Sequence, residues 1–169
     1  LGPQIVMSEQ DQSPASLMFD LLKEHNLTIT MAESCTGGYV AHQITEIAGA
    51  SSIFKGSLIA YDYDIKTTEL GVPEEVLLKT GAVSQETVEF MCEKVRLKFR
   101  SDIGIGISGI AGPNGGTEDK PVGTVYIGVS NGKQTVVKCH HFHGDRIKII
   151  QRTSNAAYNM ARKLIQGIE

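Results

Sequence analysis

A serine and a cysteine stand side by side in the segment TMAESCTGGYV. Ser34 and Cys35 are both potential nucleophiles, and both follow an apolar stretch and precede Gly37 and Gly38. A strand that turns directly into a helix aims backbone N–H groups at whatever lies before the helix, so an oxyanion or a phosphate would be stabilised there. Two interpretations remain open: one of the pair performs chemistry, or Ser34 or Thr36 is only the N-cap of a helix.

A serine becomes a good nucleophile only when a base removes its proton. The chain has neither a Gly-x-Ser-x-Gly motif nor an obvious Ser-His-Asp order, but the segment AYDYDIK places Tyr61 and Lys66 five residues apart. A lysine desolvated in a crevice can be neutral and act as a base, provided that the carboxylates of Asp62 and Asp64 point away from it. The alternative is a solvated surface lysine and a tyrosine that only packs.

A long polar loop, SGIAGPNGGTEDKPVG, covers Ser108 to Gly123 and contains five glycines. It lacks the Gly-Lys-Ser/Thr ending of a Walker loop, which argues against nucleotide triphosphate hydrolysis. Such a loop can still present N–H groups to a phosphate, and Lys120 and Arg146 are candidate phosphate contacts. The alternative is a flexible surface connection.

The segment CHHFH places Cys139, His141 and His143 on one face of a strand. Three ligands in a row on a strand suit a tetrahedral metal site poorly, so we expect no metal and no other cofactor. The three cysteines of the chain are far apart and odd in number, which argues against a disulfide framework. Cys92 lies on the apolar stripe of a helix and is most simply a core residue.

The elements that must position these residues follow from the periodicity of the apolar side chains. Ser13 and Pro14 begin a helix that ends near His25, and Asn131-Gly132 indicates a hairpin. The remaining expected elements are a strand at 27–32, a helix from Gly37, a strand from Gly56 to Tyr63, short helices closed by Gly71 and Gly81, a helix capped by Ser84, a strand at 102–108 and a last helix from Asp145 to about Gln166. That last helix repeats Ile147, Ile150, Ala157, Ala161 and Leu164 at helical spacing.

Strands separated by helices and followed by a hairpin predict an α/β fold. We expect a three-layer α/β/α sandwich with a mixed, mainly parallel sheet of about five strands, including a C-terminal hairpin. The strand at 102–108 alternates isoleucines with glycines, so its glycine face should be packed closely by a helix or a ligand.

Length and composition favour one domain, because 169 residues with 41% hydrophobic content can bury one core. We expect residues 1–12 to be a disordered tail or vector-derived sequence, and residues 13–169 to form the domain. A net charge of -3 gives no indication of nucleic-acid binding, and no apolar run is long enough to span a membrane. The expected protein is cytoplasmic and forms a homo-oligomer.

Five segments together resemble the C-terminal domain of the CinA competence/damage-inducible family: AESCTGGYVAHQITEIAGAS, GSLIAYDYDIK, GAVS, SGIAGPNGGTEDKPVGTVYIGV and FHGDR. The resemblance covers about Ser13 to Gln166. Enzymatic members of this family are nicotinamide-mononucleotide deamidases. The resemblance therefore implies a metal-independent serine amidohydrolase that converts nicotinamide mononucleotide to nicotinate mononucleotide and ammonia.

Carried over by motif, Ser34 is the nucleophile, Lys66 is the general base and Tyr61 belongs to the same proton-handling set. Cys35 is then a neighbour turned towards the interior, and the N–H groups of the turn from Cys35 to Gly38 hold the oxyanion. The expected substrate contacts lie in the turn, in the loop and near the last helix: Thr36, Gly37, Gly38, Ser108, Gly109, Ile110, Ala111, Gly112, Gly115, Gly116, Lys120 and Arg146. The alternative function is a catalytically idle interaction module linked to competence or the DNA-damage response.

Overall fold

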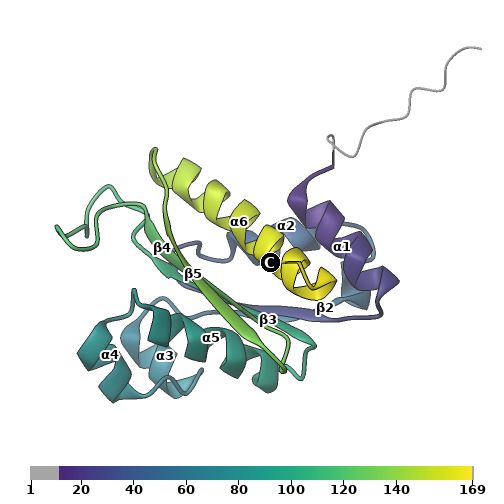
Figure 1. The fold of residues 1–169 in the computed structure, drawn as a ribbon, viewed down its shortest axis with the longest axis horizontal. Coiled ribbons are helices and arrows are strands. Elements are labelled where there is room, and N and C mark those ends of the chain that lie inside the picture. The colour runs from purple at the N-terminus through teal and green to yellow at the C-terminus, as the bar shows by residue number, and fades with distance from the viewer. Residues whose placement is uncertain (1–11, 169) are drawn as a thin grey trace, which may run out of the picture.

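The computed structural model describes residues 12–168. The expected tail at 1–12 therefore lies almost wholly outside the described residues. From 14 onward the chain forms three layers, with a five-stranded sheet between two layers of helices (Figure 1). The predicted α/β/α architecture is confirmed.

The sheet has the order β2-β1-β3-β4-β5, and its strands are β1 (Ile29–Glu33), β2 (Phe54–Ile59), β3 (Ile103–Gly109), β4 (Thr124–Ser130) and β5 (Thr135–His141). β1 pairs with β2 and β3 in parallel, whereas β3 with β4 and β4 with β5 are antiparallel. Only β4 therefore runs opposite to the others, and the predicted hairpin joins β4 to β5. The carboxyl ends of β1, β2 and β3 meet at one edge of the sheet.

One face of the sheet is covered by α1 (Pro14–Glu24), α2 (Tyr39–Thr45) and α6 (Arg146–Gln166), and the other by α3 (Tyr63–Thr68), α4 (Glu74–Thr80) and α5 (Gln85–Lys98) (Figure 1). A short 3₁₀ helix, η2 (Ala50–Ser52), precedes β2. The isoleucines of β3 belong to the core beneath α1 and α6. As expected, Ser13 caps α1 and Ser84 caps α5.

The glycine face of β3 is packed by a helix, which decides between the two sequence expectations. A Cβ atom at Gly104 would lie 2.2 Å from the carbonyl oxygen of Cys92, and one at Gly106 would lie 2.7 Å from the nitrogen of Cys92. These residues must lack a side chain because the backbone of α5 rests directly on the strand. Cys92 is fully buried there, as predicted.

One predicted boundary and one residue of a predicted helix face were wrong. β2 ends at Ile59 rather than at Tyr63, because the side chain of Asp62 caps α3 by accepting a hydrogen bond from the N–H group of Asp64. In the predicted stripe of α6, Ile150, Ala157, Ala161 and Leu164 do belong to or pack against the core, but Ile147 is 62% exposed and Ile149 is buried instead. The buried face of α6 also includes Thr153 and Ser154, so a count of apolar residues alone gives only part of that face.

Candidate active site

Ser34 and Lys66 lie in contact where β1 and β2 end. Ser34 directly follows β1, and Lys66 belongs to α3, which the chain enters shortly after β2. The Nζ atom of Lys66 lies 3.3 Å from the Oγ atom of Ser34. Because parallel strands end at the same edge, the fold brings together two residues from separate segments.

The amine of Lys66 is buried, with only 1% of the residue exposed. It donates hydrogen bonds to the carbonyl oxygens of Ala60, at 2.7 Å, and Tyr61, at 3.1 Å. Among residues 12–168 no carboxylate forms an ion pair with it. A neutral amine has two N–H bonds and one lone pair, so two donated bonds leave the lone pair available to the hydroxyl of Ser34.

Burial lowers the pKa of Lys66 from its ordinary value of 10.5, while the charge of Asp62 acts in the opposite direction. Asp62 and Asp64 are both exposed, as a basic lysine requires. The side chain of Asp62 is engaged in capping α3 rather than in pairing with the amine. The net effect of the surroundings is to lower the pKa of Lys66, which makes the uncharged form more accessible than in a solvated lysine.

Cys35 is the weaker of the two nucleophiles. Its side chain is buried within the hydrophobic core, and burial raises the pKa of its thiol to about 12. A thiol with this pKa remains protonated near neutral pH. Ser34 is also largely buried, at 8% exposed, but its hydroxyl faces Lys66.

The sequence interpretation missed Glu33, which is 0% exposed and directly precedes Ser34. Its carboxylate accepts hydrogen bonds from the hydroxyl of Thr36 at 2.7 Å and from the N–H groups of Gly38, Val40 and Ala41 at 3.0, 3.1 and 2.9 Å. The carboxylate thus occupies the amino end of α2. An ionisable residue closing an apolar strand was the available signal, because a buried carboxylate needs several donors.

These bonds narrow the set of N–H groups that could face an oxyanion. The N–H of Gly37 donates to the carbonyl of Ser34, and that of Gly38 donates to Glu33. Within the described structure, the N–H groups of Cys35 and Thr36 donate to no main-chain or carboxylate acceptor. The expected use of all N–H groups from Cys35 to Gly38 is therefore corrected to these two.

The two glycines of the turn differ in their surroundings. Gly37 has a φ of +60° and open space where a side chain would lie, whereas a Cβ atom at Gly38 would lie 3.0 Å from the side chain of Ile59. A cavity of about 360 Å³ borders the turn; it is lined by Thr36, Gly37, Gly38, Tyr39, His42, Ile147, Ile150 and Gln151. The open side of Gly37 leaves the backbone accessible to a ligand, whereas the hydroxyl of Thr36 is directed to Glu33.

Tyr61 and Arg146 form a second contact at this edge of the sheet. Arg146 donates to the hydroxyl of Tyr61 at 3.0 Å and to the carbonyl of Gly112 at 2.8 Å. Tyr61 is 58% exposed, and among the described residues its hydroxyl has no hydrogen bond to Ser34 or Lys66. The carbonyl of Tyr61, rather than its phenol, contacts the lysine. Arg146 has neutral partners only, so its charge is not matched by a carboxylate within residues 12–168.

The glycine-rich loop is held by its own backbone. The N–H of Ile110 donates to Thr124 and that of Gly123 donates to Ile110. A Cβ atom would lie within 3 Å of a neighbouring atom at Gly109, Gly112 and Gly116, so packing already requires these glycines. Gly115 has more room, with its closest neighbour at 3.7 Å. Ser108 and Ala111 are buried.

Lys120 lies against another element. Its Nζ atom donates to the carbonyl of Thr80 at 3.0 Å, at the end of α4. Arg146 has different partners, the carbonyl of Gly112 and the hydroxyl of Tyr61. The described hydrogen bonds therefore do not join the two cations at one ligand position.

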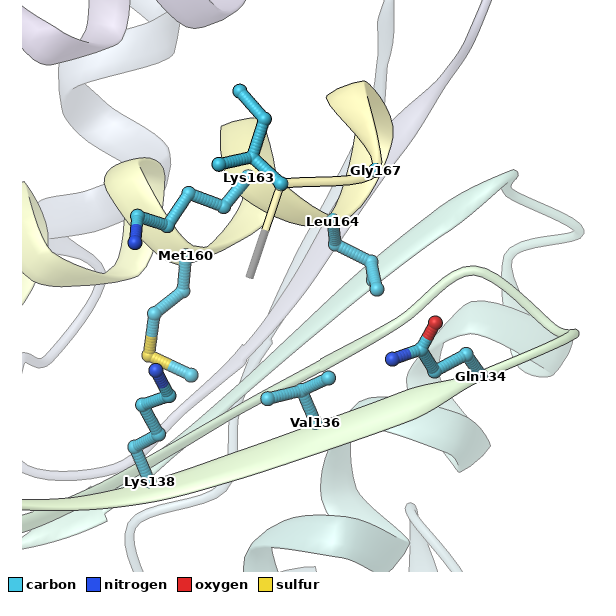
Figure 2. A pocket seen from close by; sticks show the side chains of 8 residues that line it. Gln134, Val136, Lys138, Met160, Lys163, Leu164 and Gly167 are labelled. Carbon is cyan, nitrogen blue, oxygen red and sulfur yellow. The ribbon is translucent and has the colours of Figure 1, made fainter.

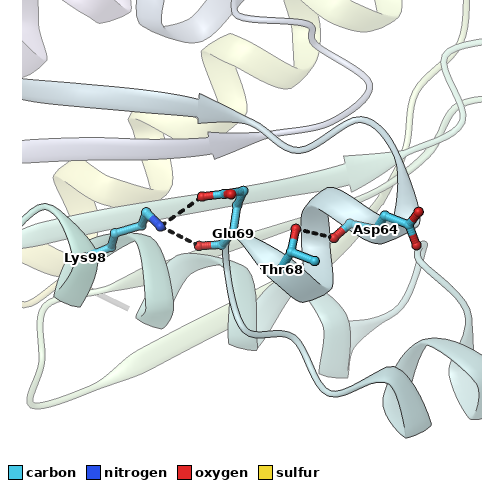
Figure 3. A network of polar contacts seen from close by, with 4 residues as sticks. All are labelled: Asp64, Thr68, Glu69 and Lys98. Atoms are coloured by element: carbon cyan, nitrogen blue, oxygen red, sulfur yellow. Dashed lines mark hydrogen bonds and ion pairs between the residues drawn. The ribbon is translucent and has the colours of Figure 1, made fainter.

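α3 is fixed by a polar network at its far end (Figure 3). Lys98 of α5 donates to the carbonyl oxygen of Glu69 at 2.9 Å and forms an ion pair with its carboxylate at 3.1 Å. Within the helix, the hydroxyl of Thr68 donates to the carbonyl of Asp64 at 2.7 Å. These contacts hold the short helix that carries Lys66.

Another hollow lies between β5 and the end of α6 (Figure 2). Its lining includes Val136, Lys138, Met160 and Leu164. This hollow lies at the carboxyl end of α6, whereas the cavity beside the turn is lined by Ile147 and Ile150 from the amino end of the helix.

Three further observations concern the described part of the chain. No group of three or more His, Cys, Asp or Glu side chains is arranged to hold a metal ion among residues 12–168. Cys139 and His141 do approach each other, with Sγ and Nε2 3.8 Å apart. No described helix has the length and apolar character needed to cross a membrane.

Comparisons with known proteins agree with the fold and the motifs. The family model described as the CinA C-terminal domain matches residues 11–165. A CinA-like protein of Cytophaga hutchinsonii is 48% identical over 149 residues, which are 88% of this chain and 36% of that protein. A CinA-like protein of Dictyoglomus thermophilum is 43% identical over 94% of this chain and 38% of its own length. The chain thus spans less than two fifths of these relatives.

Solved structures resemble the chain over most of its length. The competence/damage inducible protein CihA from Agrobacterium tumefaciens has 32% identity and a TM-score of 0.87, and the match covers 89% of this chain and 93% of that one. A CinA superfamily protein from Klebsiella pneumoniae has 27% identity and a TM-score of 0.88, over 92% and 99% of the two chains. With its motifs, fold and family model in agreement, the chain belongs to the CinA C-terminal domain family.

Proposed function

We propose that this chain is a serine amidohydrolase that converts nicotinamide mononucleotide to nicotinate mononucleotide and ammonia. The observation that carries the proposal is the 3.3 Å contact between the hydroxyl of Ser34 and the buried amine of Lys66. A serine beside a neutral lysine is an activated nucleophile that needs no metal.

In the first half of the reaction, the Oγ atom of Ser34 attacks the carboxamide carbon of the substrate while Lys66 takes the hydroxyl proton. The negative charge then develops on the carboxamide oxygen, within reach of the N–H groups of Cys35 and Thr36. Lys66 returns its proton to the amide nitrogen, the carbon–nitrogen bond breaks and ammonia leaves. An acyl ester of Ser34 remains.

In the second half, water attacks the ester carbon and gives a proton to Lys66. The carbon–oxygen bond to Ser34 breaks, the proton passes to the Oγ atom and nicotinate mononucleotide is released. Arg146 supplies a cation for the phosphate of the substrate, because among residues 12–168 its charge has no carboxylate partner. Tyr61 orients that guanidinium through its hydroxyl.

The test is the release of ammonia from nicotinamide mononucleotide by the purified chain, with chromatographic detection of nicotinate mononucleotide in equal amount. Nicotinamide riboside and free nicotinamide serve as comparison substrates. Folded protein that releases no ammonia above the level of the Ser34→Ala variant would contradict the proposal. A binding role, as in an interaction module, would then be the better description.

A further inference from the structure

Glu33 is the residue directly before Ser34, and its side chain binds the amino end of helix α2. Its side chain accepts bonds from Thr36, Gly38, Val40 and Ala41, and the hydroxyl of Ser57 on β2 lies 3.5 Å from its Oε1 atom. The segment from 34 to 37 is thereby closed into a loop: Glu33 precedes it in the chain, and the carboxylate of Glu33 binds the N–H groups that follow it. Ser34 lies inside this loop.

Local capping does not explain this arrangement. The N-cap position of α2 is Gly38, which has a left-handed backbone and no side chain to accept a hydrogen bond. A serine or an aspartate at that position would be the common solution, and it would remain near the surface. Here a fully buried carboxylate caps the helix from the other side of the turn, at a considerable desolvation cost.

The backbone of Ser34 is fixed from several directions. Its N–H donates to the carbonyl of Ile107 on β3, and its own carbonyl accepts the N–H of Gly37. Lys66 is held separately, by the carbonyls of Ala60 and Tyr61. Because the two partners are held by different segments, a shift of the turn changes the distance between Oγ and Nζ.

We propose that Glu33 is a positioning residue, whose carboxylate holds the turn so that the hydroxyl of Ser34 faces the amine of Lys66. This inference rests on the proposed chemistry of the Ser34 and Lys66 pair. The role is geometric, since the groups that shift the pKa of Lys66 are its own burial, Asp62 and Cys35.

The Glu33→Gln variant tests this role with almost no change in volume. A glutamine side chain has one acceptor oxygen, so its NH₂ group must meet either the N–H of Ala41 or the N–H groups of Gly38 and Val40. Donors that face donors displace the turn. The matched control is Asp102→Asn, because Asp102 also accepts bonds from a backbone N–H and a hydroxyl, both of Thr28, but at the opposite end of β1.

The readout is the rate at which a fluorophosphonate probe labels Ser34, measured against pH, with circular dichroism to confirm folding. The labelled residue is identified by mass spectrometry. We expect the plateau rate of Glu33→Gln to fall on the order of tenfold to a hundredfold, with an unchanged pH midpoint, as for a misplaced reactive group. Asp102→Asn should label like the wild type. Folded Glu33→Gln with a wild-type plateau, or with a displaced midpoint, would overturn the inference.

Thr36→Val decides the matter if Glu33→Gln does not fold. This variant removes one donor to Glu33 and keeps the shape of the side chain, so the plateau should fall by a smaller factor; a wild-type plateau would overturn the inference. Ser34 that labels in a Glu33-dependent manner, in a protein that does not hydrolyse nicotinamide mononucleotide, would leave the inference standing and reject the substrate. Hydrolysis of nicotinamide mononucleotide at equal rates by wild type and Glu33→Gln would support the substrate and reject the role of Glu33. Absence of labelling at Ser34 in the wild type would overturn both the proposed function and the role of Glu33.

Discussion

The amine of Lys66 lies 3.3 Å from the hydroxyl of Ser34, although 32 positions separate the two residues in the chain. No carboxylate among residues 12–168 forms an ion pair with the amine, although the charge of Asp62 partly offsets the effect of burial on its pKa. In the proposed mechanism the hydroxyl gives its proton to the amine in the first step of nucleophilic attack, and the amine returns protons in the later steps.

Replacement of Lys66 separates proton transfer from charge. We expect Lys66→Arg and Lys66→Met to lower the rate of ammonia release by about a hundredfold to ten-thousandfold, because neither side chain can accept the proton of Ser34. Steady-state assays with circular dichroism check this expectation. Substantial activity in the arginine variant would mean that the position supplies positive charge only.

The pH dependence of the rate follows from the lowered pKa of Lys66. The proposed base is the neutral amine, so the rate should rise with pH and level off above a midpoint below 10.5. A pH profile of single-turnover acylation measures this midpoint. A rate that falls as the pH rises from 6 to 9 would reject a neutral-lysine base.

The same shift affects stability. Because the folded protein binds fewer protons at Lys66 than the unfolded chain does, its free energy of unfolding gains from rising pH between the lowered pKa and 10.5. Below that pH window the amine is protonated in both states, so burying its charge lowers the free energy of unfolding by the full amount. Urea unfolding should therefore show wild type gaining on Lys66→Met as the pH increases through this window.

Ser34→Ala and Cys35→Ala should behave very differently. Removal of the proposed nucleophile, Ser34, should reduce ammonia release by at least about a thousandfold without unfolding the protein. Cys35→Ala should keep most of the activity and lose about 1 kcal/mol of stability, because its thiol is buried, protonated and part of the core. The opposite pattern of activities would assign the nucleophile to the cysteine.

Arg146 is expected to discriminate between substrates. Arg146→Ala should lower the specificity constant for nicotinamide mononucleotide by about tenfold to a hundredfold and should affect nicotinamide riboside much less. Lys120→Met should affect the two substrates similarly, since the ammonium of Lys120 is already bonded to the carbonyl of Thr80. Kinetics with both substrates test this, and an unchanged preference in Arg146→Ala would contradict a phosphate role.

The elements with strong local signals could be predicted from the sequence. Ser13 and Ser84 indicate the helices that they cap, and Asn131-Gly132 indicates the hairpin. The complete buried face of α6 could not be predicted from apolar spacing, because it includes Thr153, whose hydroxyl is bonded to the carbonyl of Ile149. A side chain whose polar group finds a partner within its own helix is not distinguished from a surface residue by its type.

The candidate site, like the fold, could be predicted from the sequence only in part. A resemblance between motifs selects Ser34, Lys66 and Tyr61, but not what each atom contacts. The phenol of Tyr61 pairs with Arg146, 85 positions away, and only the carbonyl of Tyr61 lies beside the amine. The capping of α2 by Glu33 is likewise a contact across a turn with a left-handed glycine, which helix-capping rules based on neighbouring residues do not anticipate.

The two partners of the reactive pair belong to segments that differ in their resistance to local opening. All five residues of β1 are buried in the centre of the sheet, whereas Lys66 is the one buried residue of α3 in the described structure. Helix α3 therefore gains little from apolar burial, and its ion pair with Lys98 is half exposed and adds little, so we expect α3 to open locally while the sheet stays intact. Heating should inactivate the protein before the main melting transition, and amide hydrogens of α3 should exchange long before those of β1.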